Sequence, residues 1–344
     1  MKEWFKFSTI LVTAVALLLV GAPQAVAQDA PERIRIGVQF LTATDIIAKQ
    51  RGWAEDLLGV PIEWVTFDSG RDAVLALGAG GVDMSLVGSA PAAFGMSSGI
   101  DAEVAWIFNL LGENEALVVN PESGVNSLQD LAGKTLAVPF GSTTHYDMLQ
   151  ALATVDLSER DVSLLDMDPN TMVAAFERGD IDGGWVWFPA LDGLYKAGGK
   201  KIFDALDMAD AGFPTADLLL VNRQFGATYP DAVSRYVATL NRGVLLDRED
   251  PDAAAQAMVD EFGIELETAK TAMTQVKRLS ASEQLGAAYL GASANVGAMA
   301  DALMSQAQFL RDQGLIEEAY DLAFYQERVN PSYIEGALEN NYIE

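Results

Sequence analysis

The chain has 344 residues, half of them hydrophobic, and a formal net charge of −27. This length and apolar content predict two domains with a core each, and the acidity argues against binding to nucleic acid or to anionic lipid. With no cysteine and one histidine, the sequence excludes disulfides, thiolate chemistry and metal sites built on two or three histidines, so no cofactor or metal is expected.

The N-terminus has the pattern of a secretory signal. Lys2 and Lys6 precede an apolar run over 10–20, and the small-x-small sequence Ala25-Val26-Ala27 follows. An uncleaved membrane anchor, the alternative, needs roughly 20 apolar residues, more than this run offers. We therefore predict a cleaved signal peptide at 1–27 and a soluble, periplasmic mature protein.

Next come alternating strands and helices, the pattern of an α/β protein. The first part predicts strands at 33–39, 61–67, 103–108 and 115–119, another ending at residue 87, and helices at 45–51 and 70–77. The middle part predicts strands at 135–138, 162–167, 185–187 and 217–222, and helices at 127–134, 143–155 and 171–176. From Phe225 on the chain is mostly helical, with apolar residues at helical spacing over 232–246, 251–262, 266–275 and 294–313. Two alternatives stay open for 328–344, which either packs on a lobe or extends as a tail.

One pattern occurs twice, about a hundred residues apart. A helix ends at a Gly-x-hydrophobic-Asp turn that leads into a strand, first over 80–85 and again over 179–184. The pair predicts two similarly built α/β lobes, although such a connection is also common enough to recur by chance.

The stretch from Val138 to Tyr146 is a strand, a turn and the start of a helix. Ser142 and Thr143 suit the helix cap, and the first backbone N–H groups of a helix have no partner within it. Together with the helix dipole they form a site for a sulfonate, sulfate, phosphate or carboxylate. The simpler interpretation is an ordinary capped helix.

Two predicted strands each begin with a carboxylate, Glu115 and Asp217, and would cross between the lobes. Crossing strands between α/β lobes are typical of a solute-binding protein that closes by hinge motion. The two carboxylates would hold a cationic group there.

Several motifs, in order along the mature chain, resemble the family of taurine-binding periplasmic proteins of ABC importers. They are 67–70 (FDSG), 88–91 (GSAP), 114–119 (NEALVV), 137–146 (AVPFGSTTHY), 178–183 (RGDIDG), 186–187 (VW) and 214–217 (PTAD). The resemblance implies a type II two-lobed periplasmic-binding-protein fold with a ligand cleft between the lobes and two crossing strands as the hinge. The lobes would be 28–118 with 222–344, and 119–221. It also implies a monomer that delivers taurine, 2-aminoethanesulfonate, to an inner-membrane ABC permease.

A zwitterion needs donors for its sulfonate and carboxylates for its ammonium. We expect the sulfonate at the start of the helix, the ammonium at the two carboxylates, and an aromatic ring over the methylenes or facing the cation. The expected ligand-binding residues are Gln39, Ser89, Glu115, Ser142, Thr143, Thr144, His145, Trp187 and Asp217, with none catalytic. His145, in the first turn of a helix, is expected to be neutral.

Structural alternatives exist for several of these residues. A glutamate at a strand start is usually solvated, and Trp187 also suits a core or a lobe interface. Trp185 points to the opposite face of its strand, so at most one of the two tryptophans lines the cleft.

The ligand also has alternatives. Gly141, Ala216 and Leu218 depart from the family pattern, which leaves hypotaurine or another short aminosulfonate open. An alkanesulfonate or nitrate would give the two carboxylates no cation, and a quaternary ammonium would need an aromatic cage of Trp187 with Phe40 or Trp106.

A different class is a secreted serine hydrolase that uses Ser142 or Ser89. His145 is the single candidate base and follows Ser142 by three residues, and no Gly-x-Ser-x-Gly elbow is present. Binding without chemistry is the favoured hypothesis.

Overall fold

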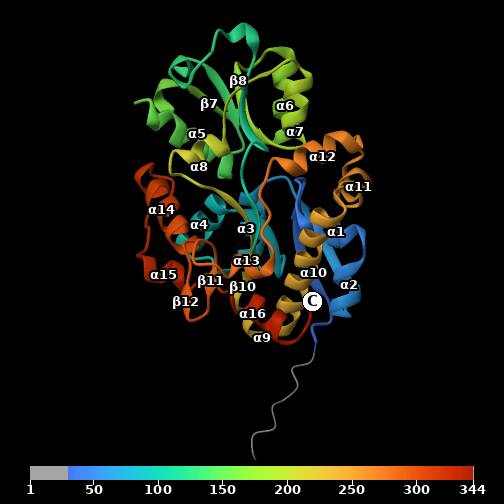
Figure 1. Cartoon of the computed structure of the whole chain (residues 1–344). Coiled ribbons are helices and arrows are strands. Elements are labelled where there is room, and N and C mark those ends of the chain that lie inside the picture. Colours follow the sequence, from blue (N-terminus) through green and yellow to red (C-terminus); the bar gives the residue numbers. More distant parts are fainter. Residues whose placement is uncertain (1–29, 344) are drawn as a thin grey trace, which may run out of the picture.

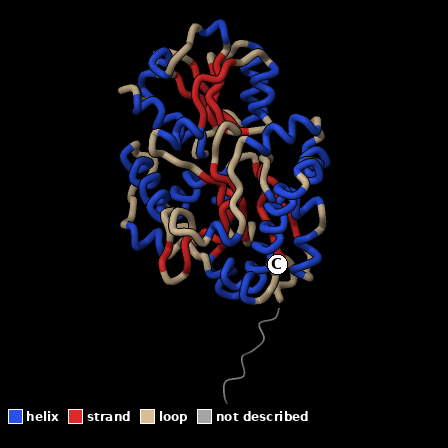
Figure 2. Tube along the Cα trace, viewed as in Figure 1, coloured by secondary structure: helices blue, strands red, loops and turns tan. Residues whose placement is uncertain are grey.

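The computed structural model describes residues 30–343. The predicted signal peptide, 1–27, lies outside the described residues. Figure 1 shows two lobes, an upper one that holds β7 and β8 and a lower one that holds β10 and α10. In each lobe a sheet is flanked by helices (Figure 2), the layering expected of an α/β fold. The architecture is that of a periplasmic binding protein with two α/β lobes.

The lower sheet has the strand order β2-β1-β3-β10-β4. The first three strands in this order run parallel, and β10 is antiparallel to both of its neighbours. The strands are β1 (Ile34–Gln39), β2 (Ile62–Phe67), β3 (Met84–Gly88), β4 (Ala102–Leu110) and β10 (Ala216–Asn222).

The upper sheet repeats this plan with the order β7-β6-β8-β5-β9. Again three parallel strands are followed by an antiparallel one, β5, in the fourth position. The prediction of two similarly built lobes is confirmed. The strands are β5 (Glu115–Val119), β6 (Thr135–Val138), β7 (Ser163–Asp166), β8 (Gly183–Trp187) and β9 (Lys200–Asp204).

The sheets place the lobe boundaries differently from the expected ones. The whole of β5 belongs to the upper sheet and the whole of β10 to the lower sheet. The chain crosses between the lobes before each of these strands, after β4 and again after α8, so the carboxylates of Glu115 and Asp217 stand where the two crossings end. The expected boundaries divided strands that pair along their full length, and hydrogen bonding keeps such a strand in one sheet.

Side-chain caps fix several helix starts. Ser69 accepts from Asp72 N at 3.2 Å, and Asp168 accepts from Thr171 N at 2.9 Å. The upper lobe carries α5 (Thr143–Thr154), α6 (Pro169–Arg178), α7 (Ala190–Lys196) and α8 (Ala205–Asp210), with 3₁₀ turns η1 (Pro121–Ser123), η2 (Leu128–Leu131) and η3 (Glu159–Asp161).

The lower lobe carries the remaining helices and a short hairpin. Its helices are α1 (Thr44–Gln50), α2 (Trp53–Leu58), α3 (Gly70–Gly78), α4 (Ser89–Ser97), α9 (Arg223–Thr228), α10 (Pro230–Glu249), α11 (Pro251–Phe262), α12 (Leu266–Thr274), α13 (Ala281–Gln284), α14 (Met299–Asp312), α15 (Leu322–Gln326) and α16 (Ser332–Glu339). The hairpin pairs β11 (Gly291–Ala292) with β12 (Asn295–Val296).

Two local expectations need correction, and one open alternative is resolved. The helix predicted over 127–134 is the single 3₁₀ turn η2, closed by a capping box between Ser127 and Asp130. The helix predicted over 294–313 begins only at Met299, because the preceding residues form the hairpin. Of the two alternatives for 328–344, the described part packs on the lower lobe, where α16 lies against α10 and Val329 bridges to Val104.

Within residues 30–343 no helix is long and apolar enough to cross a membrane. The same residues contain no group of three or more metal-ligating side chains placed to hold a metal ion.

Candidate functional site

A small cavity of about 20 Å³, here called the inner cavity, lies between the lobes. Each lobe contributes to its wall, as expected for a ligand cleft in this fold. It is lined by Gln39, Leu41, Gly70, Gly88, Pro91 and Asp217 of the lower sheet and its helices, and by Glu115, Ser142, Thr143 and Trp187 of the upper ones. Six of the nine expected ligand-binding residues therefore meet at one place.

One end of the inner cavity is the N-terminus of α5. Ser142, the N-cap, has an extended backbone and its hydroxyl accepts from His145 N at 3.2 Å. The same hydroxyl donates to Pro139 O at 2.6 Å, which holds the cap against the end of β6. Thr143 Oγ1 is buried and has no hydrogen-bond partner among residues 30–343. This end thus presents hydroxyl and N–H groups and no formal charge.

Gly88 faces this helix end from the lower lobe. A Cβ atom at position 88 would collide with the Thr143 hydroxyl, although the backbone there, with φ −67°, suits any residue. Glycine is therefore needed for close approach of the lobes and not for its backbone angles. The Gly88-Ser89-Ala90-Pro91 motif marks this turn in the sequence, but its pattern does not predict the contact with Thr143.

Two carboxylates, Glu115 and Asp217, also line the inner cavity, and this part of its wall is here called its carboxylate end; each is 3% exposed. Asp217 Oδ2 accepts from Asn109 Nδ2 at 2.8 Å, whereas Glu115 Oε2 has no partner in the described part of the chain. Strand pairing brings them here: Asp217 lies opposite Gly88 on β3, and Glu115 lies opposite Trp187 on β8. Two residues a hundred positions apart thus face one cavity.

Burial and mutual repulsion make the ionised forms of these two carboxylates energetically unfavourable. Burial, then the charge of Asp217, then that of Asp147, raises the pKa of Glu115 well above its usual range. Burial raises the pKa of Asp217 to about 7, against the lowering effects of the Asn109 hydrogen bond and the Arg278 charge. A bound cation would favour the ionised form of both.

Further charged residues surround the pair. Asp147, one helical turn after Thr143, is fully buried, both of its carboxylate oxygens lack a partner within 30–343, and burial raises its pKa well above the usual range. Burial also raises the pKa of Asp45 to about 7. Arg278 approaches from behind Asp217, but its guanidinium is held by Asp247 Oδ2 at 2.9 Å and Thr42 O at 3.0 Å.

The sequence analysis missed these residues. The i, i+4 spacing of Thr143 and Asp147 was a usable signal for a common helix face. Asp45 and Arg278 have no local pattern that indicates burial beside the site.

Three expected site residues do not line the inner cavity. Ser89 lies at the start of α4, where its hydroxyl accepts from Ala216 N at 3.2 Å. Thr144 is fully buried and its hydroxyl pairs with that of Ser142 at 2.9 Å. His145 stacks on Phe140 at 4.5 Å between ring centroids, and its Nδ1 accepts from Gly141 N at 3.2 Å. Thr144 and His145 therefore support the helix end, whereas Ser89 holds the start of β10, next to Asp217.

His145 has the electrostatics of a neutral imidazole. Burial lowers its pKa to about 4. Because its Nδ1 accepts from Gly141 and the Ser142 hydroxyl donates to Pro139, the described geometry gives Ser142 no general base.

The two tryptophans of β8 differ in depth. Trp187 lines the inner cavity, while Trp185 is fully buried and packs edge-on to Phe203 at 6.4 Å between ring centroids. The expectation that they point to opposite faces is wrong, because residues two apart on a strand share a face, and the pair lies opposite Glu115 and Leu117 of β5. Gln39 is oriented by a bond from its Nε2 to Leu86 O at 2.9 Å.

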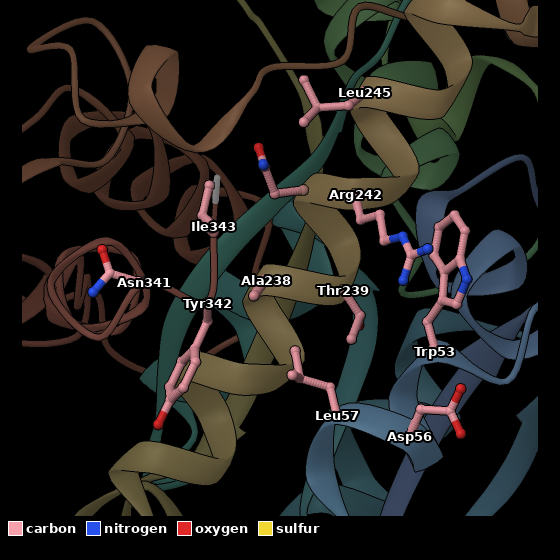
Figure 3. Close-up of a pocket in the computed structure, with 11 residues that line it drawn as sticks. Trp53, Asp56, Leu57, Ala238, Thr239, Arg242, Leu245, Asn341, Tyr342 and Ile343 are labelled. Carbon is pink, nitrogen blue, oxygen red and sulfur yellow. The ribbon is translucent and has the colours of Figure 1, made fainter.

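A larger cavity of about 500 Å³ lies within the lower lobe, against α2, α10 and the C-terminal residues (Figure 3). Arg242 stacks there over the Trp53 ring at 4.0 Å. Its walls come from one lobe and hold none of the buried carboxylates described above, so it does not share the chemistry of the inner cavity.

Known proteins resemble this chain over much of its length. The family model described as NMT1/THI5 like matches residues 39–254. A taurine-binding periplasmic protein from Escherichia coli K12 is 38% identical over 178 residues, and this match spans 52% of the chain and only 55% of that relative. A putative aliphatic sulfonates-binding protein from Bacillus subtilis 168 is 30% identical over 264 residues, 74% of this chain and 78% of that protein.

Solved structures share the fold at lower identity. The alkanesulfonate-binding protein SsuA from Xanthomonas axonopodis pv. citri bound to MOPS matches with a TM-score of 0.71 and 23% identity over 86% of this chain and 98% of that one. The desulfurization enzyme DSZB matches with a TM-score of 0.63 and 16% identity over 90% and 100%. Since a binding protein and an enzyme share this fold, function has to be argued from the site.

Proposed function

The chain belongs to the NMT1/THI5-like family, and from this premise we propose that it is the extracytoplasmic solute-binding protein of an ABC importer, with taurine as its ligand. The observation that carries the proposal is the inner cavity, with neutral donors at one end and two buried carboxylates at the other. A compact zwitterion, with an anion and an ammonium two carbons apart, complements both ends.

Each chemical group of taurine would meet a different part of the inner cavity. The sulfonate lies against Thr143 and the first N–H groups of α5, where the helix end stabilises an anion without an arginine. The ammonium donates to Glu115 and Asp217 as charge-assisted hydrogen bonds. The Trp187 ring covers the methylenes. Ser142, Thr144 and His145 hold the donors in position, and Ser89 holds Ala216 beside Asp217.

Its role as the binding protein of an importer implies where the protein is located and how it moves. A signal peptide at 1–27 sends the protein to the periplasm, where it binds as a monomer, closes by hinge motion at the two crossings and docks on an inner-membrane permease. In this structure the inner cavity has room for about one water molecule, so taurine does not fit between the lobes as they stand here. The lobes therefore open to admit taurine, and they stand further apart around it than in this structure.

Hypotaurine is the second candidate, because its sulfinate and ammonium match the same two ends. An alkanesulfonate, as in the name of the Bacillus subtilis relative, leaves the two carboxylates without a cation. Their repulsion disfavours that ligand.

Isothermal titration calorimetry with taurine, ethanesulfonate and choline tests the proposal. Taurine should bind at least tenfold more tightly than either, because each of the others lacks one of its charges. Equal affinity for taurine and ethanesulfonate would contradict the role of the carboxylates.

A matched pair of variants sharpens the test. Asp217→Asn should weaken taurine binding by about tenfold or more, of the order of a buried charged hydrogen bond. Glu103→Gln is the control, since Glu103 is also buried in the lower sheet but pairs with Val221 at the other end of β10. It should leave the affinity unchanged.

A further inference from the structure

The cavity of about 500 Å³ in the lower lobe, here called the α10 cavity, shares no lining residue with the inner cavity. Its apolar wall comes from three segments that are far apart in the sequence: Leu57 of α2, Ala238 and Leu245 of α10, and Ile343 after α16. Sites for small molecules have volumes of roughly 300 to 1,000 Å³ and walls that are mostly apolar. The α10 cavity therefore has the size and the wall of a site for a small organic molecule.

Two arginines of α10, Arg235 and Arg242, lie two helical turns apart and are held in different ways. Arg235 donates to Asp231 Oδ2 at 2.8 Å, to Leu57 O at 3.2 Å and to the Tyr342 hydroxyl at 2.8 Å, so it fixes two residues of the cavity wall. Arg242 is exposed, and among residues 30–343 its guanidinium forms no hydrogen bond and no ion pair, although the chain has 49 acidic residues and 22 basic ones. One arginine thus braces the wall, and the other keeps its donors available.

The guanidinium of Arg242 is nevertheless held in one orientation. It stacks over the Trp53 ring at 4.0 Å (Figure 3), and Trp53 itself packs on a buried apolar cluster formed by α1, α11 and α12. Stacking uses the face of the guanidinium, whereas its N–H donors lie in its plane. The stack therefore presents a fixed planar fork, which matches the two oxygens of a carboxylate.

We propose that the α10 cavity is a second ligand site, which binds a small aromatic monocarboxylate. The carboxylate pairs with Arg242, and the ring lies on the apolar wall. This site goes beyond the proposed function and does not depend on it. Asp56, which is exposed in the same cavity, limits the charge of the ligand, because it would repel a second negative group.

Calorimetry with 2-naphthoate tests the role of the guanidinium. Arg242→Gln should weaken binding about fivefold, the order of an exposed charged pair, and the loss should shrink in high salt. Arg311→Gln is the matched control, since Arg311 is an exposed arginine of α14 that pairs with its neighbour Asp312, and its loss changes the net charge by the same amount. It should leave the affinity unchanged. Absence of binding to the wild-type protein, or equal losses in the two variants, overturns the inference.

Asp56→Asn should act in the opposite direction. It removes a negative charge from the wall, so 2-naphthoate should bind about twofold more tightly, and again less so in high salt. Unchanged or weaker binding in this variant would contradict a carboxylate held in the α10 cavity.

Two ligand comparisons test the apolar wall and the location of the site. 2-Naphthoate should bind about fivefold more tightly than benzoate, because its second ring buries more apolar surface; equal affinities would contradict contact with the apolar wall. Saturating taurine should leave the affinity for 2-naphthoate unchanged, whereas displacement would place 2-naphthoate in the inner cavity and overturn the inference. If taurine itself does not bind, the proposed function fails, and the Arg242 and Asp56 variants still decide this one.

Discussion

The two ends of the inner cavity are built in opposite ways. The helix end comes from one continuous stretch, its hydroxyls are largely hydrogen-bonded within that stretch, and it carries no formal charge. The carboxylate end joins β5 of the upper sheet to β10 of the lower one, and the charges of Glu115 and Asp217 raise each other's cost of burial. One end is preorganised at little cost, and the other is unfavourable until a cation arrives.

The two ends therefore bind the two charges of the ligand in different ways. A neutral helix end accepts an anion without changing its own protonation. The carboxylate end changes its protonation with pH and ligand, and it forms only when both lobes are in place. We therefore expect pH and lobe geometry to act mainly on the binding of the ammonium.

The largest expected effect is that of pH on affinity. The pKa of Asp217 is raised to about 7, so the carboxyl must lose a proton before it pairs with an ammonium. Below that pKa the apparent affinity falls about tenfold per pH unit, or about 100-fold from pH 8 to pH 5. Calorimetry of taurine binding across this range measures it. A flat profile would mean that the carboxylates do not meet the ammonium.

Stability of the ligand-free protein should depend on pH in the opposite sense to the usual carboxylate case. Asp217 titrates at about 7 when folded and at about 3.9 when unfolded. Between these values the folded state binds more protons, so the free energy of unfolding falls as pH rises through this window. Asp217→Asn removes the contribution, and its stability relative to wild type should be greater at pH 8 than at pH 5 by about 2.6 kcal/mol.

Urea unfolding of both proteins at the two pH values measures this difference. Comparing the variant with wild type cancels the titrating groups that do not interact with Asp217, such as Glu283, whose pKa is lowered to about 2 by its hydrogen bond from Arg248. Glu115 does not cancel, because the charge of Asp217 raises its pKa. An equal difference at both pH values would contradict a buried, proton-binding Asp217.

The local sequence pattern was sufficient to predict the structure of the helix end. The run from Val138 to Tyr146 predicted strand, turn and capped helix, and the cap at Ser142 is where the pattern placed it. Such information is local because a capping hydrogen bond spans three residues. Strand β9 was missed because local composition does not indicate it. It begins with Lys200-Lys201, and it is a strand because it pairs with β5.

The carboxylate end needed more than local pattern. Their places at the start of the two predicted crossing strands singled out Glu115 and Asp217, but their burial follows from strand register and lobe packing. Gly88 was missed because its role depends on the approach of Thr143 across the lobes. Asn109 and Asp147 were missed because they meet Asp217 and Glu115 through packing within the lower and the upper lobe, which local pattern does not reveal. The lobe boundaries were misplaced for a related reason, since hydrophobicity does not tell which sheet a buried strand joins.

Lobe contact at the helix end gives the next prediction. Gly88→Ala keeps an allowed backbone but places a methyl group against the Thr143 hydroxyl, which should hold the lobes apart. We expect taurine affinity to fall by about tenfold, the order of an overpacked contact, with little change in the urea midpoint of the ligand-free protein. Unchanged affinity would show that binding does not require the helix end to approach Gly88.

The smallest expected effect tests whether the helix end binds its anion without a cationic side chain. Arg71 packs its stem on Gly141 but pairs its guanidinium with Asp166 across the lobes at 3.5 Å, and both partners are about 40% exposed. Exposed pairs contribute about 0.2 to 1 kcal/mol, so Arg71→Ala should weaken taurine binding no more than about fivefold, and less in high salt. Calorimetry at low and high salt measures this, with Arg33→Ala as the control because Arg33 forms an exposed pair with Glu63 on the lower sheet, away from the inner cavity. A loss near 100-fold in the Arg71 variant alone would make that guanidinium a direct sulfonate ligand, and the contrast between a neutral end and a charged end would no longer hold.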